Sequence, residues 1–166
     1  MRNEESKPGM KKISNTANLA ELLPFIEERL AAGQTIKFSP HGISMLPMIR
    51  QGKDTVVLSA PPEKLKKFDI PLYRRDDGHF VLHRVVGVGE TYTCIGDNQF
   101  EKERGIRHDQ IIAVVSAFTK NGKEHSTNEP GYRTYCVIWH ISRPIRRLWR
   151  AFKSRLRGII KRLKKS

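Results

Sequence analysis

Short runs of β-branched and aromatic residues recur between residues 35 and 119, and this pattern limits the possible folds more than any other feature of the chain. Turn-forming pairs, Asp77-Gly78 and Asn121-Gly122, separate some of these runs. The runs occupy residues 35–38, 55–58, 70–73, 80–86, 92–95 and 111–119. Several short strands with turns between them predict a compact, mainly β domain over about residues 35–125.

A helix is predicted directly before this domain. Leucine and isoleucine residues recur there at helical spacing, and Gly33 follows as a stop signal. Pro24 falls inside the pattern, so the helix is expected either to kink there or to begin after it. Together with a polar arm over residues 1–14, this helix makes up a first unit, residues 1–34. The apolar positions are Leu19, Leu22, Leu23, Ile26 and Leu30.

Residues 126–166 are expected to form a linker followed by a basic amphipathic helix. Apolar residues step by three or four, arginine and lysine fill most positions between them, and Pro144 is expected in the first turn. No acidic residue follows Glu129, and twelve basic residues lie from Arg133 onward. Subtracting these twelve from the net charge of +14 leaves +2 for the rest of the chain. The apolar positions are Ile138, Ile141, Ile145, Leu148, Phe152, Leu156, Ile159 and Leu163.

A helix of this composition predicts binding to an anionic membrane surface through residues 144–166. Packing of the apolar stripe on the domain is an alternative. Nucleic acid is disfavoured, because the charge lies opposite a continuous apolar stripe and only Trp139 and Trp149 are available to stack on bases.

The chain has neither an N-terminal apolar run typical of a signal peptide nor a stretch of about 18 apolar residues. We therefore expect a peripheral, membrane-associated protein, with the cytoplasmic face favoured. Cys94 and Cys136 are expected to be buried thiols, although two cysteines could also pair.

Ser44 is the leading candidate nucleophile. It lies between Gly42 and Pro47, where the backbone can bend sharply and bring a hydroxyl close to a backbone N–H group. A serine in such a setting is most often part of an ordinary turn. Two downstream segments favour a nucleophile over an ordinary turn residue. His83 interrupts the apolar run 80–86, and Asp97 lies in a glycine-aspartate-asparagine segment that precedes a charged loop.

These segments, in this order and spacing, resemble the conserved boxes of the signal peptidase I superfamily, which includes the LexA-like self-cleaving repressors. The resemblance runs from about Phe38 to Lys120 and implies a β fold with Ser44 as nucleophile. Most members carry a lysine base where this chain has His83. A histidine there resembles the endoplasmic-reticulum-type branch, and its ordinary pKa of about 6.5 suits a general base at neutral pH.

The acid that orients the histidine departs from the family pattern. In the endoplasmic-reticulum-type branch an aspartate pair follows the glycine-aspartate-asparagine box, and Lys102-Glu103 stands at the matching place. Glu103 is therefore the candidate acid. Glu101 and Asp97 stay open as alternatives, and Asp97 could instead brace the loop.

The predicted oxyanion and substrate site consists of Gly42 and Met45 around the backbone N–H of Ser44. His41 is a further candidate for the cleft wall. We expect no cofactor and no metal, since the histidines lack ligand spacing.

The expected function is a serine endopeptidase that cleaves an extended leader or signal-type peptide, with a peptide or preprotein as partner. One alternative is a LexA-like self-cleaving regulator. It is disfavoured because His83 replaces the lysine base and because the first 35 residues show no helix-turn-helix pattern. The other alternative is a non-catalytic module that binds membrane surfaces.

Overall fold

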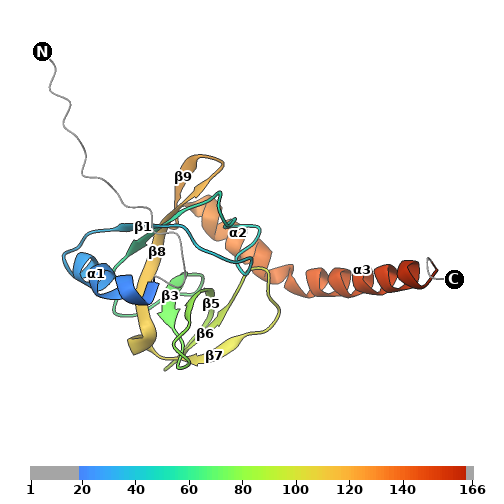
Figure 1. Cartoon of the computed structure of the whole chain (residues 1–166), viewed down its shortest axis with the longest axis horizontal. Helices are drawn as coiled ribbons and strands as arrows, with labels where there is room; N and C mark the ends of the chain where they lie inside the picture. The colour runs from blue at the N-terminus through green and yellow to red at the C-terminus, as the bar shows by residue number, and fades with distance from the viewer. Residues whose placement is uncertain (1–18, 164–166) are drawn as a thin grey trace, which may run out of the picture.

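The computed structural model describes residues 19–163, with side chains through residue 156, as two antiparallel sheets and three helices (Figure 1). The polar arm predicted for residues 1–14 lies outside the described residues, as do the side chains of Ile159 and Leu163. The expectation of a mainly β domain is met only in coarse form, because helices and strands take comparable shares of the chain.

Helix α1, Leu19–Ala31, corresponds to the helix predicted from the leucine spacing. It buries Leu19, Ile26 and Leu30, which lie on one face. The helix does not start late, since Pro24 lies inside it. It ends as predicted at Gly33, whose φ of 71° favours glycine and whose N–H donates to the carbonyl of Leu30.

The larger sheet is built around one long strand, β8. The strand order is β1, β2, β8, β3, β4, and β9 also pairs with β8. Every pairing is antiparallel, and β8 is hydrogen-bonded to β2, β3 and β9 along its length. The bounds are Ile36–Phe38 for β1, Val56–Ser59 for β2, Pro71–Arg74 for β3, Phe80–Leu82 for β4, Ile111–Lys120 for β8 and Lys123–Ser126 for β9.

The second sheet contains β5, Arg84–Val88, β6, Tyr92–Ile95, and β7, Glu103–Ile106, in that order. The chain leaves the larger sheet after Leu82 and enters the second sheet at Arg84. The run 80–86, predicted as one strand, is therefore two strands in different sheets, and His83 lies at the crossing between them.

Two apolar clusters hold these layers together. The first packs α1 and α2 against the larger sheet and includes Ile26, Val56 and Cys136. The second lies on the smaller sheet and includes Val85 and Cys94. Both cysteines are buried and free, as expected for structural thiols.

The C-terminal part differs from the predicted linker. Residues 123–126 form β9, and residues 130–141 form α2, Pro130–Ile141, which buries Tyr132 and Cys136 in the first apolar cluster. The start of the predicted linker, from residue 126, is therefore the end of a strand, a short turn and a helix whose buried side chains pack on the body. Helix α3, Arg143–Leu163, carries Pro144 in its first turn, as predicted. None of the helices within residues 19–163 is both long and apolar enough to span a bilayer.

Candidate active site

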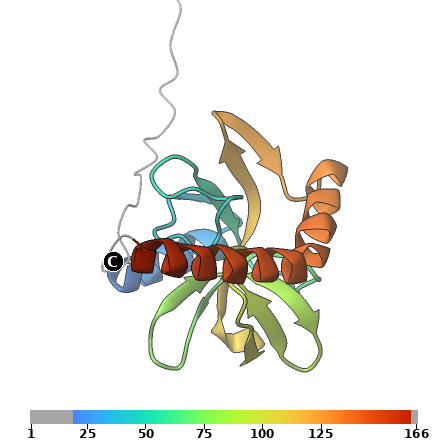
Figure 2. The same cartoon turned by 90° about the vertical axis from the view of Figure 1, so that its right-hand side faces the viewer.

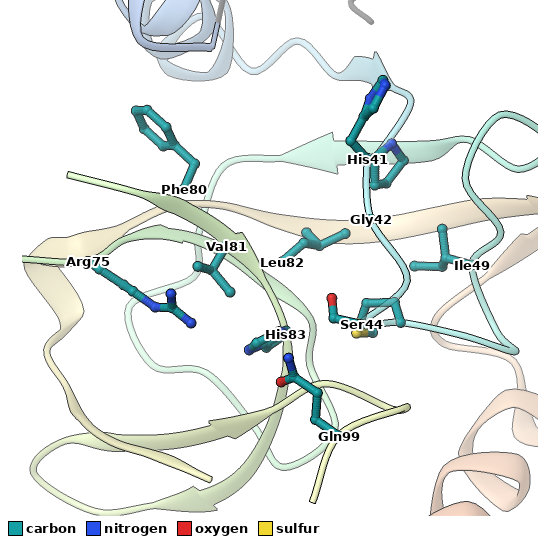
Figure 3. Close-up of a pocket in the computed structure, with 12 residues that line it drawn as sticks. His41, Gly42, Ser44, Ile49, Arg75, Phe80, Val81, Leu82, His83 and Gln99 are labelled. Atoms are coloured by element: carbon teal, nitrogen blue, oxygen red, sulfur yellow. The ribbon is translucent and has the colours of Figure 1, made fainter. Parts of the chain in front are cut away.

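A cleft of about 190 Å³ opens between β4 and the loop of residues 39–55 that joins β1 to β2. Figure 3 shows Ser44 and His83 on the walls of this pocket, with Arg75 further along. His41, which the sequence offered as a wall residue, also lines the cleft. The remaining lining residues are Pro40, Gly42, Met45, Ile49, Phe80, Val81, Leu82 and Gln99.

Buried apolar side chains anchor the loop that carries Ser44, residues 39–55, to the core. Met45, Met48 and Ile49 are buried in the first apolar cluster, whereas Ser44 itself is half-buried at the cleft. This alternation turns the serine outward while its neighbours anchor the backbone. Gly42 has a φ of 95°, which glycine adopts at little cost and other residues rarely do.

The glycine-aspartate-asparagine segment, residues 96–98, clamps this loop. The backbone N–H of Asn98 donates to the carbonyl of Ser44 at 2.7 Å, and the Asn98 side chain donates to the carbonyl of Ile43 at 3.1 Å. Gly96 lies so close that a Cβ atom there would stand 2.7 Å from the Ser44 carbonyl oxygen. The segment therefore holds the backbone of the serine through hydrogen bonds and close contact.

His83 is paired with Glu103. Its Nδ1 lies 2.9 Å from Glu103 Oε1, and the histidine is only 2% exposed. At this distance a proton on Nδ1 faces the carboxylate, which leaves Nε2 as the basic nitrogen of the neutral ring. Nε2 makes no hydrogen bond within the part of the chain that the structure describes. This is the arrangement in which a histidine can accept a proton from a serine hydroxyl.

Glu103 is in turn held by two residues of β3 and the turn after it. Arg75 donates through Nε at 2.8 Å and through Nη2 at 2.5 Å, and the Tyr73 hydroxyl donates at 2.8 Å. Burial alone would raise the pKa of Glu103, but the hydrogen bonds from Arg75 and Tyr73 and the charge of Arg75 hold it below its ordinary value. Glu103 is therefore a fixed carboxylate.

The pKa of His83 is lowered from its ordinary value of 6.5, chiefly because burial disfavours the charged ring. Glu103 raises this pKa and Arg75 lowers it, and neither reverses the effect of burial. His83 is consequently neutral at pH 7, the state required of a general base. Among the described residues no hydrogen bond joins Ser44 to His83; catalytic hydrogen bonds are often long until substrate tightens the site.

Asp97 has a different partner. Both of its carboxylate oxygens accept from Arg84, at 2.8 and 2.7 Å, and both side chains are almost fully buried. Asp97 therefore braces the core and does not orient His83, so its alternative assignment as the acid is wrong for this geometry. Glu101 is exposed and has no ion pair within residues 19–156.

The predicted oxyanion residues differ in what their backbone can donate. The N–H of Gly42 is already donated to the side chain of Gln51 at 2.8 Å. Among the described residues, the N–H groups of Ser44 and Met45 have no acceptor. Gly42 lines the cleft within the predicted substrate site, and the backbone N–H groups left available there among the described residues are those of Ser44 and Met45.

Arg75 and Tyr73 complete the site but were not predicted from the sequence. Tyr73 lies in a run with an ordinary strand pattern and Arg75 just after it. Such a pattern does not predict an interaction with a carboxylate, here Glu103, 28 to 30 residues away. Only the pairing of β3 with its neighbours brings them to Glu103.

Comparison of the chain with protein-family models, with curated proteins and with solved structures found no significant match. The assignment of this site therefore depends on its own geometry.

Proposed function

We propose that the protein is a serine endopeptidase in which Ser44 is the nucleophile, His83 the general base and Glu103 the residue that orients the base. One observation carries the proposal: His83 Nδ1 lies 2.9 Å from Glu103 Oε1 at the wall of a cleft that Ser44 also lines. A histidine held in one tautomer beside a serine is the chemical requirement for activating a hydroxyl at neutral pH.

In this mechanism His83 Nε2 removes the proton from Ser44 Oγ as the oxygen attacks the peptide carbonyl. The negative charge on the carbonyl oxygen is met by the backbone N–H groups of Ser44 and Met45. His83 then gives its proton to the leaving amine, and the acyl-enzyme remains on Ser44. Water, activated by the same histidine, hydrolyses the ester and restores the serine.

Arg75 and Tyr73 contribute by keeping Glu103 ionised and in place. Because the carboxylate stays charged, it stabilises the imidazolium that forms when His83 takes the proton. Arg75 is therefore a positioning residue that acts on the reaction through Glu103.

The substrate class that this cleft supports best is an extended peptide. The lining beside Ser44 combines the apolar side chains of Ile49, Val81 and Leu82 with polar groups, and its volume of about 190 Å³ suits one small side chain of a bound peptide. Together with the resemblance to the signal peptidase I superfamily, this favours a leader or signal-type peptide as substrate.

Peptide cleavage tests the proposal. The purified protein is incubated at neutral pH with a complex mixture of peptides, and new peptide termini are identified by mass spectrometry. We expect cleavage by the wild type and by Ser154→Ala, a matched control at an exposed serine of α3. Ser44→Ala and His83→Ala are expected to give no new termini. Equal cleavage by Ser44→Ala and the wild type would overturn the proposal.

A further inference from the structure

Helix α3 is attached to the body by its polar face. Arg146 donates to the carbonyls of Asp97, at 3.1 Å, and Trp139, at 2.6 Å, and its guanidinium lies 3.4 Å from the centre of the Trp139 ring. One turn later, Arg150 donates to the side chain of Asn98 at 2.6 Å. Figure 1 shows the helix continuing beyond the sheets, and Figure 2 shows it crossing in front of the body.

The face of α3 beside these arginines is apolar and open to solvent. Its members recur at steps of three and four residues, so they share one side of the helix. In a helix of a globular protein such a face normally packs on the core. Here the apolar face stays exposed, because the arginines hold the helix to the body. The exposed fractions are 69% for Ile145, 73% for Leu148, 58% for Trp149, 57% for Phe152 and 46% for Leu156.

Two further apolar residues are exposed at the end of the preceding helix. Ile138 and Ile141 of α2 are 63% and 67% exposed. The five exposed apolar residues of α3 are more than the scattered single residues of an ordinary protein surface.

Positive charge flanks the apolar row of α3. Helix α3 contains nine basic residues and no acidic one. Arg147, Lys153 and Arg155 are exposed and take no part in the ion pairs among the described residues. Trp149 stacks on Phe152, and the Lys153 ammonium lies 5.1 Å from the centre of the Trp149 ring. Aromatic rings beside basic side chains are suited to the boundary between lipid headgroups and acyl chains.

We propose that the exposed face of α3 inserts into the surface of an anionic lipid bilayer, with the helix lying in the plane of the membrane. The apolar row enters the acyl boundary, and the basic side chains beside it contact anionic headgroups. A nucleic acid would satisfy the charge and leave the apolar row in water. This inference is independent of the proposed peptidase activity.

Membrane binding of this kind fixes the orientation of the body. The arginines of α3 are bonded to Asp97 and Asn98, and Asn98 also holds the loop that carries Ser44. The cleft therefore keeps a fixed relation to the membrane plane, and peptides presented at that surface reach it in one orientation.

Vesicle sedimentation with the full-length protein tests the proposal. We expect the wild type and Ser44→Ala to pellet with vesicles of phosphatidylcholine and phosphatidylglycerol and to remain in solution with phosphatidylcholine alone. The double variant Leu148→Glu, Phe152→Glu is expected to bind at least about tenfold more weakly, because it places charge in the acyl boundary. Phe25→Glu, the matched control at an exposed apolar residue of α1, is expected to bind like the wild type.

Tryptophan fluorescence gives a second measurement that does not depend on the folding of the double variant. Binding is expected to shift the emission to shorter wavelength, and Trp149→Phe is expected to remove most of that shift while the protein still pellets. Full binding by the double variant would overturn the proposal, as would equal binding to neutral vesicles. Binding to duplex DNA or RNA without binding to anionic vesicles would also overturn it.

Discussion

Glu103 and Asp97 are both held by an arginine, but their other neighbours give them different roles. Glu103 is half-buried and shares its oxygens among Arg75, Tyr73 and His83. Asp97 is fully buried, and both of its carboxylate oxygens accept hydrogen bonds from Arg84. Position in the sequence left both as candidate acids. Their hydrogen-bond partners distinguish an orienting carboxylate from a structural one.

Replacement of Glu103 should therefore slow chemistry. We expect Glu103→Gln to reduce the rate of reaction of Ser44 with a fluorophosphonate by about 100-fold, because the amide cannot stabilise the imidazolium. Glu101→Gln is the control, and we expect it to react like the wild type. An unchanged rate in Glu103→Gln would contradict the orienting role.

The pH profile of the same reaction tests the state of His83. Burial lowers the pKa of His83 below 6.5, so the neutral, active form persists at pH 7 and is lost only as the pH falls below that value. We expect a flat rate above pH 6.5 that declines in more acidic buffer. In Glu103→Gln the decline should move to still lower pH, because the charge that raises this pKa is gone. An inflection above pH 7 in the wild type would contradict this account.

Replacement of Asp97 should instead affect stability. Asp97→Ala leaves the Arg84 guanidinium buried without a counterion, and this is expected to lower the free energy of unfolding by about 3–5 kcal/mol in urea titrations. Adding Arg84→Met removes the unpaired charge, so the double variant should regain part of the loss. A loss no larger than that of an exposed ion pair, below about 1 kcal/mol, would argue against a structural role.

At the scale of elements, the sequence predicts α1, the strand content of residues 35–119 and the loop of Ser44. It does not predict that the run 80–86 divides between two sheets at His83, because alternation within a run carries no information about its partners. Strands β7 and β9 were missed since their segments, ERGI and KEHS, are too polar to show a strand pattern. Glu103 opens β7, so its position at His83 depends on this unpredicted strand.

The contact between the segment 96–98 and the Ser44 loop gives a prediction at this scale. A methyl group at position 96 would press on the Ser44 carbonyl, so Gly96→Ala should shift the nucleophile and slow fluorophosphonate labelling by about 100-fold. Gly131→Ala, in the first turn of α2 with open space around it, is the matched control and should react normally. Equal rates in the two variants would contradict the clamp.

At the scale of the whole molecule, the units predicted from the sequence do not divide the chain as the structure does. The sequence predicts a linker and basic tail over residues 126–166, but Tyr132 and Cys136 of α2 accept hydrogen bonds from the buried Arg84 and complete the apolar core. The sequence does not predict this packing, because the apolar residues of α2 and α3 form one continuous helical pattern that does not separate the two helices.

Truncation tests whether α2 belongs to the folded body or to a separate tail. A chain ending at Ser126 removes α2 and opens the core around Arg84, so we expect it to lose its cooperative thermal transition. Loss of a buried aromatic residue such as Tyr132 alone costs about 3–5 kcal/mol. A chain ending at Leu156 keeps every described contact and should melt like the full protein. Cooperative melting of the shorter chain at the same temperature would contradict this packing.

The central claim is that His83 activates Ser44, and the position of a covalent adduct tests it most directly. The protein is treated with a fluorophosphonate at neutral pH and digested, and the modified residue is identified by tandem mass spectrometry. The account predicts one adduct, on Ser44, that is absent in His83→Ala. An adduct on another residue, or labelling that is undiminished in His83→Ala, would contradict it.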